Sequence, residues 1–293
     1  MRASDFVYEK ELGFGSFGRV YRVRSKSDNK LYVIKEQTGR STPKMVTNEI
    51  EILKKMRHPN IVAYYDSWRE DNKGFILMEY ASRGTLKQLL RSYNKPFPEE
   101  DALYLFAQIA LGIHHIHKRW VLHRDLKPGN IMLHGSRGDI VKIGDFGIAK
   151  NVENGTARTF AGTEPYMAPE IFEGKIYDFS CDIWSAGIIL YELLTNRYPF
   201  VTKNRLEMME QINQGRLRRL PEGDLSSGTI ELTYKMLRRD PSRRPRSGFL
   251  VLCPALLQPI MKVYLNVGRI EKAMILGTET FENYMEVGQK SIS

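Results

Sequence analysis

Residues 180–195 (SCDIWSAGIILYELLT) form a run in which nearly every side chain is apolar. A helix that is hydrophobic on all sides has to be buried inside a larger structure. The run is shorter than the roughly 20 residues that a membrane-spanning helix needs, and no uninterrupted apolar run in the chain approaches that length. The segment therefore predicts the central helix of a large helical unit, with no membrane insertion.

The first 80 residues have a different character, because their apolar residues alternate as in β-strands. Strands are predicted around residues 6–12, 19–25, 30–36, 61–68 and 74–80, and a helix at 45–56. After Gly84, amphipathic helices are predicted at 99–117, 204–214 and 228–237. We expect an α+β fold with two lobes: a small β-rich lobe with one main helix (1–80), a larger α-helical lobe (81–257), and a tail of unknown role (258–293). A cleft between lobes is a favoured ligand site.

Composition and charge exclude some classes of protein. The net charge is +10 over 293 residues, but the basic clusters at 216–220 and 238–246 are interrupted, which favours a solvated face over a nucleic-acid-binding patch. The first ten residues lack the apolar segment of a secretory signal. Cys181 and Cys253 both stand in apolar surroundings, which indicates reduced, buried thiols and an intracellular location.

A glycine-rich segment, Gly13-Phe14-Gly15-Ser16-Phe17-Gly18, precedes the second predicted strand. Glycines at this spacing let backbone N–H groups approach phosphate oxygens closely. A Rossmann loop has the same spacing, but it opens a helix, whereas a strand follows here. The segment therefore favours a phosphate-covering hairpin.

A lysine ends the next apolar strand, at Lys35, where its ammonium group should point into the cleft. Glu49, on the following helix, is the predicted partner that fixes this lysine for a phosphate. Glu51 is the rival by proximity, and Glu49 is preferred because it shares a helical face with Leu53 and Met56.

Two polar segments follow in the larger lobe. His123-Arg124-Asp125-Leu126-Lys127-Pro128-Gly129-Asn130 places an aspartate and an asparagine five residues apart, which suits a hydroxyl acceptor and a metal ligand. Asp145-Phe146-Gly147 places a carboxylate at a strand end, and carboxylate oxygen suits Mg²⁺. Ala168-Pro169-Glu170, Asp182 and Arg244 are interpreted as structural.

In this order and in these contexts, the motifs resemble the protein-kinase signature set over residues 5–257. The resemblance implies that Gly13, Gly15 and Gly18 cover the phosphates of ATP, that Lys35 and Glu49 hold them, and that Asp125 accepts the substrate proton. It implies that Asn130 and Asp145 bind Mg²⁺. Further predicted contacts to ATP, around the adenine, are Leu12, Val20, Val33, Met78, Glu79, Ala81 and Met132.

Lys127 and Thr163 mark serine/threonine specificity within that resemblance. Arg124, directly before Asp125, implies activation by a phosphorylated loop. Candidate sites are Thr156, Thr159 and Thr163, of which Thr159 is chosen by position, with Lys150 as a second cation for the phosphate.

The segments YVIKE, HPNIVAYYDSW and MEYASRGTL look most like NIMA-related kinases. That likeness implies protein substrates, a cytoplasmic location with the cytoskeleton, centrosome or nucleus as further sites, and roles in cell-cycle, microtubule or ciliary processes. The alternatives are a catalytically weak pseudokinase or scaffold, a nucleic-acid-binding module suggested by charge alone, and a small-molecule kinase. The presence of all the catalytic residues argues against a pseudokinase, and the dispersed charge argues against a nucleic-acid-binding module. The segment 162–170, which binds peptides in protein kinases, argues against a small-molecule kinase.

Overall fold

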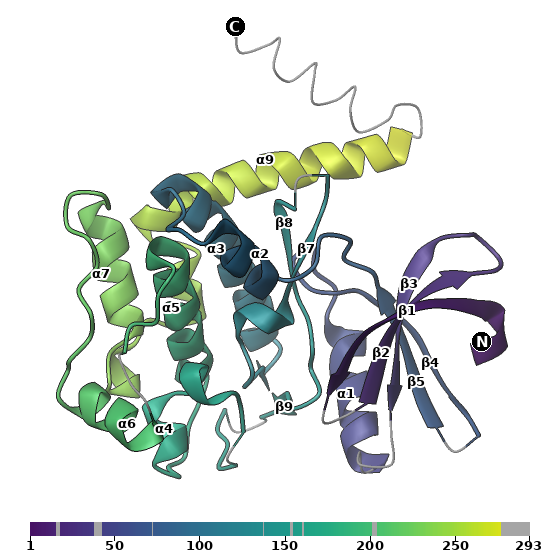
Figure 1. Ribbon diagram of the computed structural model, residues 1–293, viewed down its shortest axis with the longest axis horizontal. Coiled ribbons are helices and arrows are strands. Elements are labelled where there is room, and N and C mark those ends of the chain that lie inside the picture. Colours follow the sequence, from purple (N-terminus) through teal and green to yellow (C-terminus); the bar gives the residue numbers. More distant parts are fainter. Residues whose placement is uncertain are drawn as a thin grey trace, which may run out of the picture.

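Two lobes make up the computed structural model, which describes residues 1–15, 18–37, 43–71, 73–136, 138–152, 155–159, 161–200 and 204–276. In Figure 1 the N-terminal part of the chain forms a sheet with one helix, and the later part forms a helical lobe beside it. The predicted α+β fold with two lobes is confirmed.

The smaller lobe contains a five-stranded antiparallel sheet in the order β1-β2-β3-β5-β4. Its elements are η1 (Ala3–Asp5), β1 (Phe6–Gly15), β2 (Gly18–Ser25), β3 (Leu31–Gln37), α1 (Pro43–Lys55), β4 (Tyr64–Glu70) and β5 (Lys73–Glu79). Side chains alternate between the two faces of each strand. Lys35 therefore lies on one face, and Ile34 lies on the other in a buried cluster with Phe6, Val23, Phe75 and Leu77.

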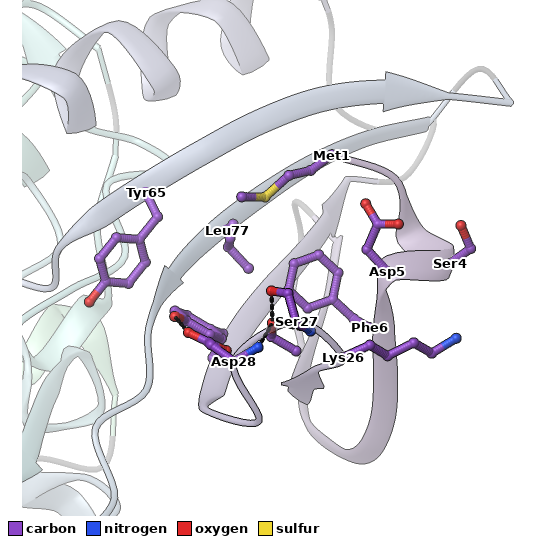
Figure 2. Close-up of a pocket in the computed structure, with 11 residues that line it drawn as sticks. Met1, Ser4, Asp5, Phe6, Lys26, Ser27, Asp28, Tyr65 and Leu77 are labelled. Carbon is purple, nitrogen blue, oxygen red and sulfur yellow. Dashed lines mark hydrogen bonds between the residues drawn. The ribbon is translucent and has the colours of Figure 1, made fainter.

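A cavity of about 540 Å³ opens on the face of the sheet that carries Leu77 (Figure 2). The N-terminal segment from Met1 to Phe6, the turn at residues 25–28, and the rings of Tyr32 and Tyr65 line it. None of the predicted site residues borders this cavity, so it is separate from the predicted ATP site.

The larger lobe is built around the predicted apolar helix, which is α5 (Ser180–Thr195), and every residue from Cys181 to Leu194 is buried. The prediction of a central helix is therefore correct. The remaining helices are α2 (Leu86–Tyr93), α3 (Glu99–His117), α4 (Pro169–Phe172), α6 (Arg205–Asn213), α7 (Ser227–Met236), α8 (Ser247–Leu250) and α9 (Pro254–Leu276).

Short strands and single helical turns complete the larger lobe. The strands are β6 (Val121–Leu122), β7 (Ile131–His134), β8 (Ile140–Ile143) and β9 (Lys150–Asn151), and the turns are η2 (Pro128–Asn130), η3 (Glu164–Tyr166) and, further on, η4 (Pro241–Arg243). β7 pairs with β8 and β6 pairs with β9, each antiparallel. These pairs set the positions of the loops that carry the candidate site.

Helix α9 lies along the larger lobe (Figure 1) and continues through residues 258–276 of the predicted tail. It packs on α3, where the ammonium group of Lys262 lies 2.8 Å from the carboxylate of Glu100 and the amide of Asn266 donates to the hydroxyl of Tyr104 at 2.9 Å. The rest of the predicted tail, 277–293, lies outside the described residues.

One stretch of the described chain, residues 241–266, has the length and apolar composition of a membrane-spanning helix, and 28% of an apolar 18-residue window within it is buried. Length and composition are weak grounds for a span, and the backbone of this stretch is divided among η4, α8 and α9.

Candidate active site

The glycine-rich segment forms the ends of β1 and β2, which pair as a hairpin with Gly13 opposite Val20 and Gly15 opposite Gly18. Gly18 has φ of 147°, and a Cβ there would lie 2.1 Å from the carbonyl oxygen of Glu36. Only glycine fits such a position. Ser16 and Phe17, at the tip, lie outside the described residues. A strand follows the glycines, as the protein-kinase interpretation requires and a Rossmann loop does not.

Three of the predicted adenine-contacting side chains, Val20, Val33 and Met78, share one face of the sheet. Val20 pairs with Lys35 across β2 and β3, and Val33 pairs with Met78 across β3 and β5. All three apolar residues are partly buried, while Leu12, at the edge of β1, is 43% exposed. Glu79 ends β5 and Ala81 follows it, so both lie where the chain passes between the lobes. Met132, in β7 of the larger lobe, forms a backbone bridge with Thr85, a few residues after this passage.

Lys35 sits between two carboxylates. Its Nζ lies 2.6 Å from Oε1 of Glu49 and 3.2 Å from Oδ1 of Asp145. Lys35 and Glu49 are both buried, and the amide of Gln37 donates to the second oxygen of Glu49 at 3.1 Å. The alternative partner, Glu51, is exposed. The structure therefore pairs Lys35 with Glu49 and adds Asp145 from the other lobe.

The contact between Lys35 and Asp145 keeps both side chains charged. Burial alone would lower the pKa of Lys35, but the carboxylates of Glu49 and Asp145 outweigh it and raise that pKa. Desolvation likewise acts against ionisation of Asp145, and Lys35 nevertheless holds the pKa of Asp145 below its usual value. The ammonium group and the carboxylate are thus both charged at neutral pH.

Asp125 accepts hydrogen bonds from three side chains. Oδ1 accepts from Oγ1 of Thr163 at 2.7 Å, and Oδ2 accepts from Nζ of Lys127 at 2.6 Å and from Nδ2 of Asn130 at 2.9 Å. Lys127 also donates to Oγ1 of Thr163 at 2.6 Å. The four residues therefore form one network, in which Thr163 joins Lys127 to Asp125.

The β7–β8 pair brings the two predicted metal ligands together. Ile131 pairs with Ile143, so Asn130, just before β7, lies beside Gly144, and the N–H of Gly144 donates to the carbonyl of Asn130 at 2.9 Å. Asp145 follows directly, in the left-handed region with φ of 58°. An amide oxygen and a carboxylate from neighbouring chain segments fit Mg²⁺, which takes few protein ligands and completes its shell with phosphate oxygens and water.

No group of three or more His, Cys, Asp or Glu side chains suited to a metal ion occurs within the ranges of the chain given above. The predicted magnesium site, with one carboxylate and one amide, is of a different kind, because it depends on the phosphates of the nucleotide.

Asp182, interpreted from the sequence as structural, holds in place the loop that contains Asp125. Its carboxylate is 1% exposed and accepts from the backbone N–H groups of His123 and Arg124, each at 2.9 Å. The ring of His117 contributes a third contact at 2.9 Å. Burial would raise the pKa of Asp182, and these donors hold it below its usual value. The loop before Asp125 is therefore tied to the first turn of α5.

His123 connects this anchor to Asp145. Its Nε2 lies 3.0 Å from the carbonyl oxygen of Gly144, and its ring contacts the fully buried ring of Phe146 at a centroid distance of 5.0 Å. His123 thus holds Gly144 and Phe146, the two neighbours of Asp145, in place.

Glu170 and Arg244 form a buried, bidentate ion pair, with distances of 2.7 and 2.8 Å between guanidinium and carboxylate. The two side chains are 4% and 0% exposed. Replacing Glu170 with alanine should destabilise the fold by about 3–5 kcal/mol, because it leaves a buried charge without its partner. Urea denaturation followed by circular dichroism measures this. Glu100→Ala, which breaks an exposed pair with Lys262, is the control and should change the midpoint little; equal effects would contradict the prediction.

The fold, the glycine hairpin and the convergent polar residues are those of a protein kinase, and comparison with known proteins agrees. Residues 6–254 match the family described as "Protein kinase domain", and the chain belongs to that family.

Within it, the chain is similar to serine/threonine kinases of the Nek group, which confirms the NIMA-related likeness. It is 37% identical to "Serine/threonine-protein kinase Nek8" of Danio rerio over 92% of this chain and 39% of that protein. It is 39% identical to Nek5 of Homo sapiens, over 86% of this chain and 36% of that protein. The identity to Nek3 of Mus musculus is 40%, over 88% of this chain and 50% of that protein. The chain thus spans half or less of the length of these curated relatives.

Proposed function

We propose that this chain transfers the γ-phosphoryl group of ATP to serine or threonine hydroxyls of protein substrates. The observation that carries the proposal is the convergence of Lys35, Asp125, Asn130 and Asp145. Lys35 contacts Asp145, the backbone of Gly144 next to Asp145 contacts Asn130, and Asn130 contacts Asp125. They come from three separate segments of the chain, at residue 35, residues 125–130 and residue 145, so chance would not bring them together in this way.

The residues have separate roles in the proposed reaction. The charged Lys35 holds the α- and β-phosphates of ATP, and the glycine hairpin covers them. Asn130 and Asp145 would hold Mg²⁺, which would supply positive charge against the phosphates. Asp125 accepts or orients the proton of the substrate hydroxyl, and Lys127 stabilises charge on the transferred group. Val20, Val33 and Met132 enclose the adenine, beside Met78 and the backbone of Glu79 and Ala81.

Serine/threonine specificity is supported by the Lys127–Thr163–Asp125 network. Thr163 fixes the orientation of both Lys127 and Asp125, and it belongs to the segment 162–170, which we propose as the shelf for a protein substrate. The relatives named as serine/threonine-protein kinases are consistent with this assignment.

Transfer of labelled phosphate from ATP to a generic protein substrate tests the function. A folded protein that binds Mg²⁺–ATP without transferring phosphate would favour the alternative, a pseudokinase that acts as a scaffold. Comparing acidic with neutral protein substrates in the same assay shows whether the positive net charge favours acidic substrates. A peptide library with one position varied at a time would then define the preferred sequence.

We further propose that phosphorylation of Thr159 activates the enzyme. Oγ1 of Thr159 lies 2.6 Å from Nη1 of Arg124, and the hydroxyl of Tyr177 donates to the carbonyl of Thr159 at 2.8 Å. A phosphate at this hydroxyl would meet Arg124 directly, with Lys150 on β9, opposite Leu122, as a second cation. Tyr177 has no recognisable motif, and sequence reasoning missed it.

Removing the acceptor of this phosphate should lower activity. Thr159→Ala is expected to reduce turnover about tenfold or more, because a charge-assisted hydrogen bond contributes about 1.5–3 kcal/mol. Arg124→Ala should make activity independent of phosphorylation, and Thr156→Ala serves as the matched control in the same loop. Kinetics of phosphatase-treated and untreated enzyme, with intact-mass analysis, measure the effect. A fully active enzyme with no phosphate on this loop would contradict the switch.

The resemblance to Nek kinases supports a location inside the cell, at the cytoskeleton, centrosome or nucleus, and partners there. Both cysteines, Cys181 and Cys253, are buried and unpaired, which suits a reducing compartment. Fluorescence imaging of the tagged chain with centrosomal and microtubule markers tests the location.

A further inference from the structure

A buried carboxylate lies beneath the proposed substrate shelf. Glu192, in the last turns of α5, is 9% exposed, and its Oε2 accepts a hydrogen bond from the hydroxyl of Tyr166 at 2.8 Å. The hydroxyl of Tyr166 lies 2.6 Å from that of Tyr198, whose side chain is 40% exposed. These three residues, the Glu192 cluster, connect a buried acid to the surface through two phenols.

Tyr166 connects the Glu192 cluster to the hydrogen-bond network around Asp125. It ends η3, and its backbone N–H donates to the carbonyl of Thr163 at 2.9 Å. Ser185 of α5 donates to the carbonyl of Tyr166 at 2.7 Å. Both ends of Tyr166 are thus attached to α5, by its hydroxyl and by its carbonyl. A change in the hydroxyl contact therefore reaches Thr163 and, through it, Asp125 and Lys127.

The charge of Glu192 depends on groups from each element around it. Burial dominates and raises its pKa from the ordinary value to about 7, while the hydroxyls of Tyr166 and Tyr198, and Lys87 on α2, act in the opposite direction. Burial raises the pKa of the Tyr198 hydroxyl, and the positive charge of Arg91, also on α2, acts in the opposite direction. None of these groups is on the loop that contains Asp125.

We propose that Glu192 is a positioning residue for the protein substrate: its ionised carboxylate, by accepting from Tyr166, fixes the shelf at residues 163–166, and protonation loosens it. This rests on the proposed function, because it assumes that the segment is the substrate shelf. An ionised carboxylate accepts stronger hydrogen bonds from phenols than a neutral acid does. The shelf is therefore held firmly above neutral pH and loosely below it.

The stability of the fold changes in the opposite direction. The folded state keeps the proton of Glu192 up to about pH 7, whereas the unfolded chain releases it near its ordinary pKa of 4.5. Between these two values the folded state binds more protons, so the contribution of Glu192 to stability falls as pH rises through this window. Ionised Glu192 thus fixes the shelf but lowers the stability of the fold. Because this contribution to stability increases as pH falls, weaker substrate binding at low pH would not result from unfolding.

The test compares the KM for a peptide substrate from pH 6.0 to 8.5 in the wild type, Glu192→Gln and the control Glu231→Gln. Glu231 is an exposed residue on α7 paired with Lys235. For the wild type and Glu231→Gln, the peptide KM should rise about fivefold as pH falls through about 7, because charge-assisted hydrogen bonds are roughly twice as strong as neutral ones. Glu192→Gln should show the high KM at every pH, with an unchanged KM for ATP. Parallel profiles for the wild type and Glu192→Gln would overturn the proposal.

A second measurement does not depend on catalysis. Infrared difference spectra between pH 6 and 8 should show loss of a protonated carboxyl band in the wild type, and this change should be missing in Glu192→Gln. Thermal unfolding verifies that the variant is folded. Absence of the wild-type band would overturn the proposal even in an active enzyme. A present band with no phosphotransfer to any peptide would instead count against the proposed function, so the two failures are distinguishable.

Discussion

Asp145→Ala is expected to abolish phosphotransfer while the protein remains folded. The substitution removes a proposed Mg²⁺ ligand and one of the two carboxylates beside Lys35. A metal ion contributes several kcal/mol of charge stabilisation in such reactions, so the rate should fall by roughly 10³-fold or more. The fold should survive because Lys35 keeps its buried contact with Glu49 at 2.6 Å, which leaves no charge without a partner.

Initial rates with ATP and a protein substrate measure this effect, and the thermal unfolding midpoint verifies the fold. Asp224→Ala, at an exposed position in the loop before α7, is the matched control and should keep full activity. Normal turnover by purified Asp145→Ala would refute the assignment of Asp145 as a metal ligand.

Asp125→Asn should lower kcat by about 10²–10⁴-fold, the usual contribution of general acid–base catalysis. Asparagine keeps the shape of the side chain and still offers an oxygen to Thr163 or Lys127, but it is too weak a base to take the substrate proton. Because the ATP contacts at Lys35 and Asp145 are unchanged, the KM for ATP should stay within a few-fold.

Steady-state kinetics with ATP and peptide varied separately distinguish the two parameters. Asp101→Asn, in the exposed first turn of α3, is the matched control. A kcat for Asp125→Asn close to that of the wild type would show that Asp125 does not act as the base.

The elements of the fold were predictable where apolar periodicity was long and unbroken. Helices 99–117 and 180–195 were predicted with the same bounds as α3 and α5, because charged first turns or complete burial define their ends. Helix α1 begins two residues before the prediction, at Pro43, since proline fits the first turn of a helix and no apolar residue marks it. α9 extends past residue 257, where the resemblance to kinases ended.

The candidate site was predictable in its motifs and not in its connections. Lys35, Asp125 and Asp145 belong to recognisable spacings, and the structure brings them together. Tyr177 and Glu192 lie in runs without a motif, and their contacts join segments more than 15 residues apart in the chain. Periodicity describes neighbours along one element, so it cannot identify a carboxylate that serves a distant loop.

The hydrogen bonds from His123 and Arg124 to Asp182 make the position of the loop that contains Asp125 depend on the buried helix α5. Because every residue from Cys181 to Leu194 is buried, substitutions in this part of α5 would destabilise the fold and disturb the loop that contains Asp125 at the same time.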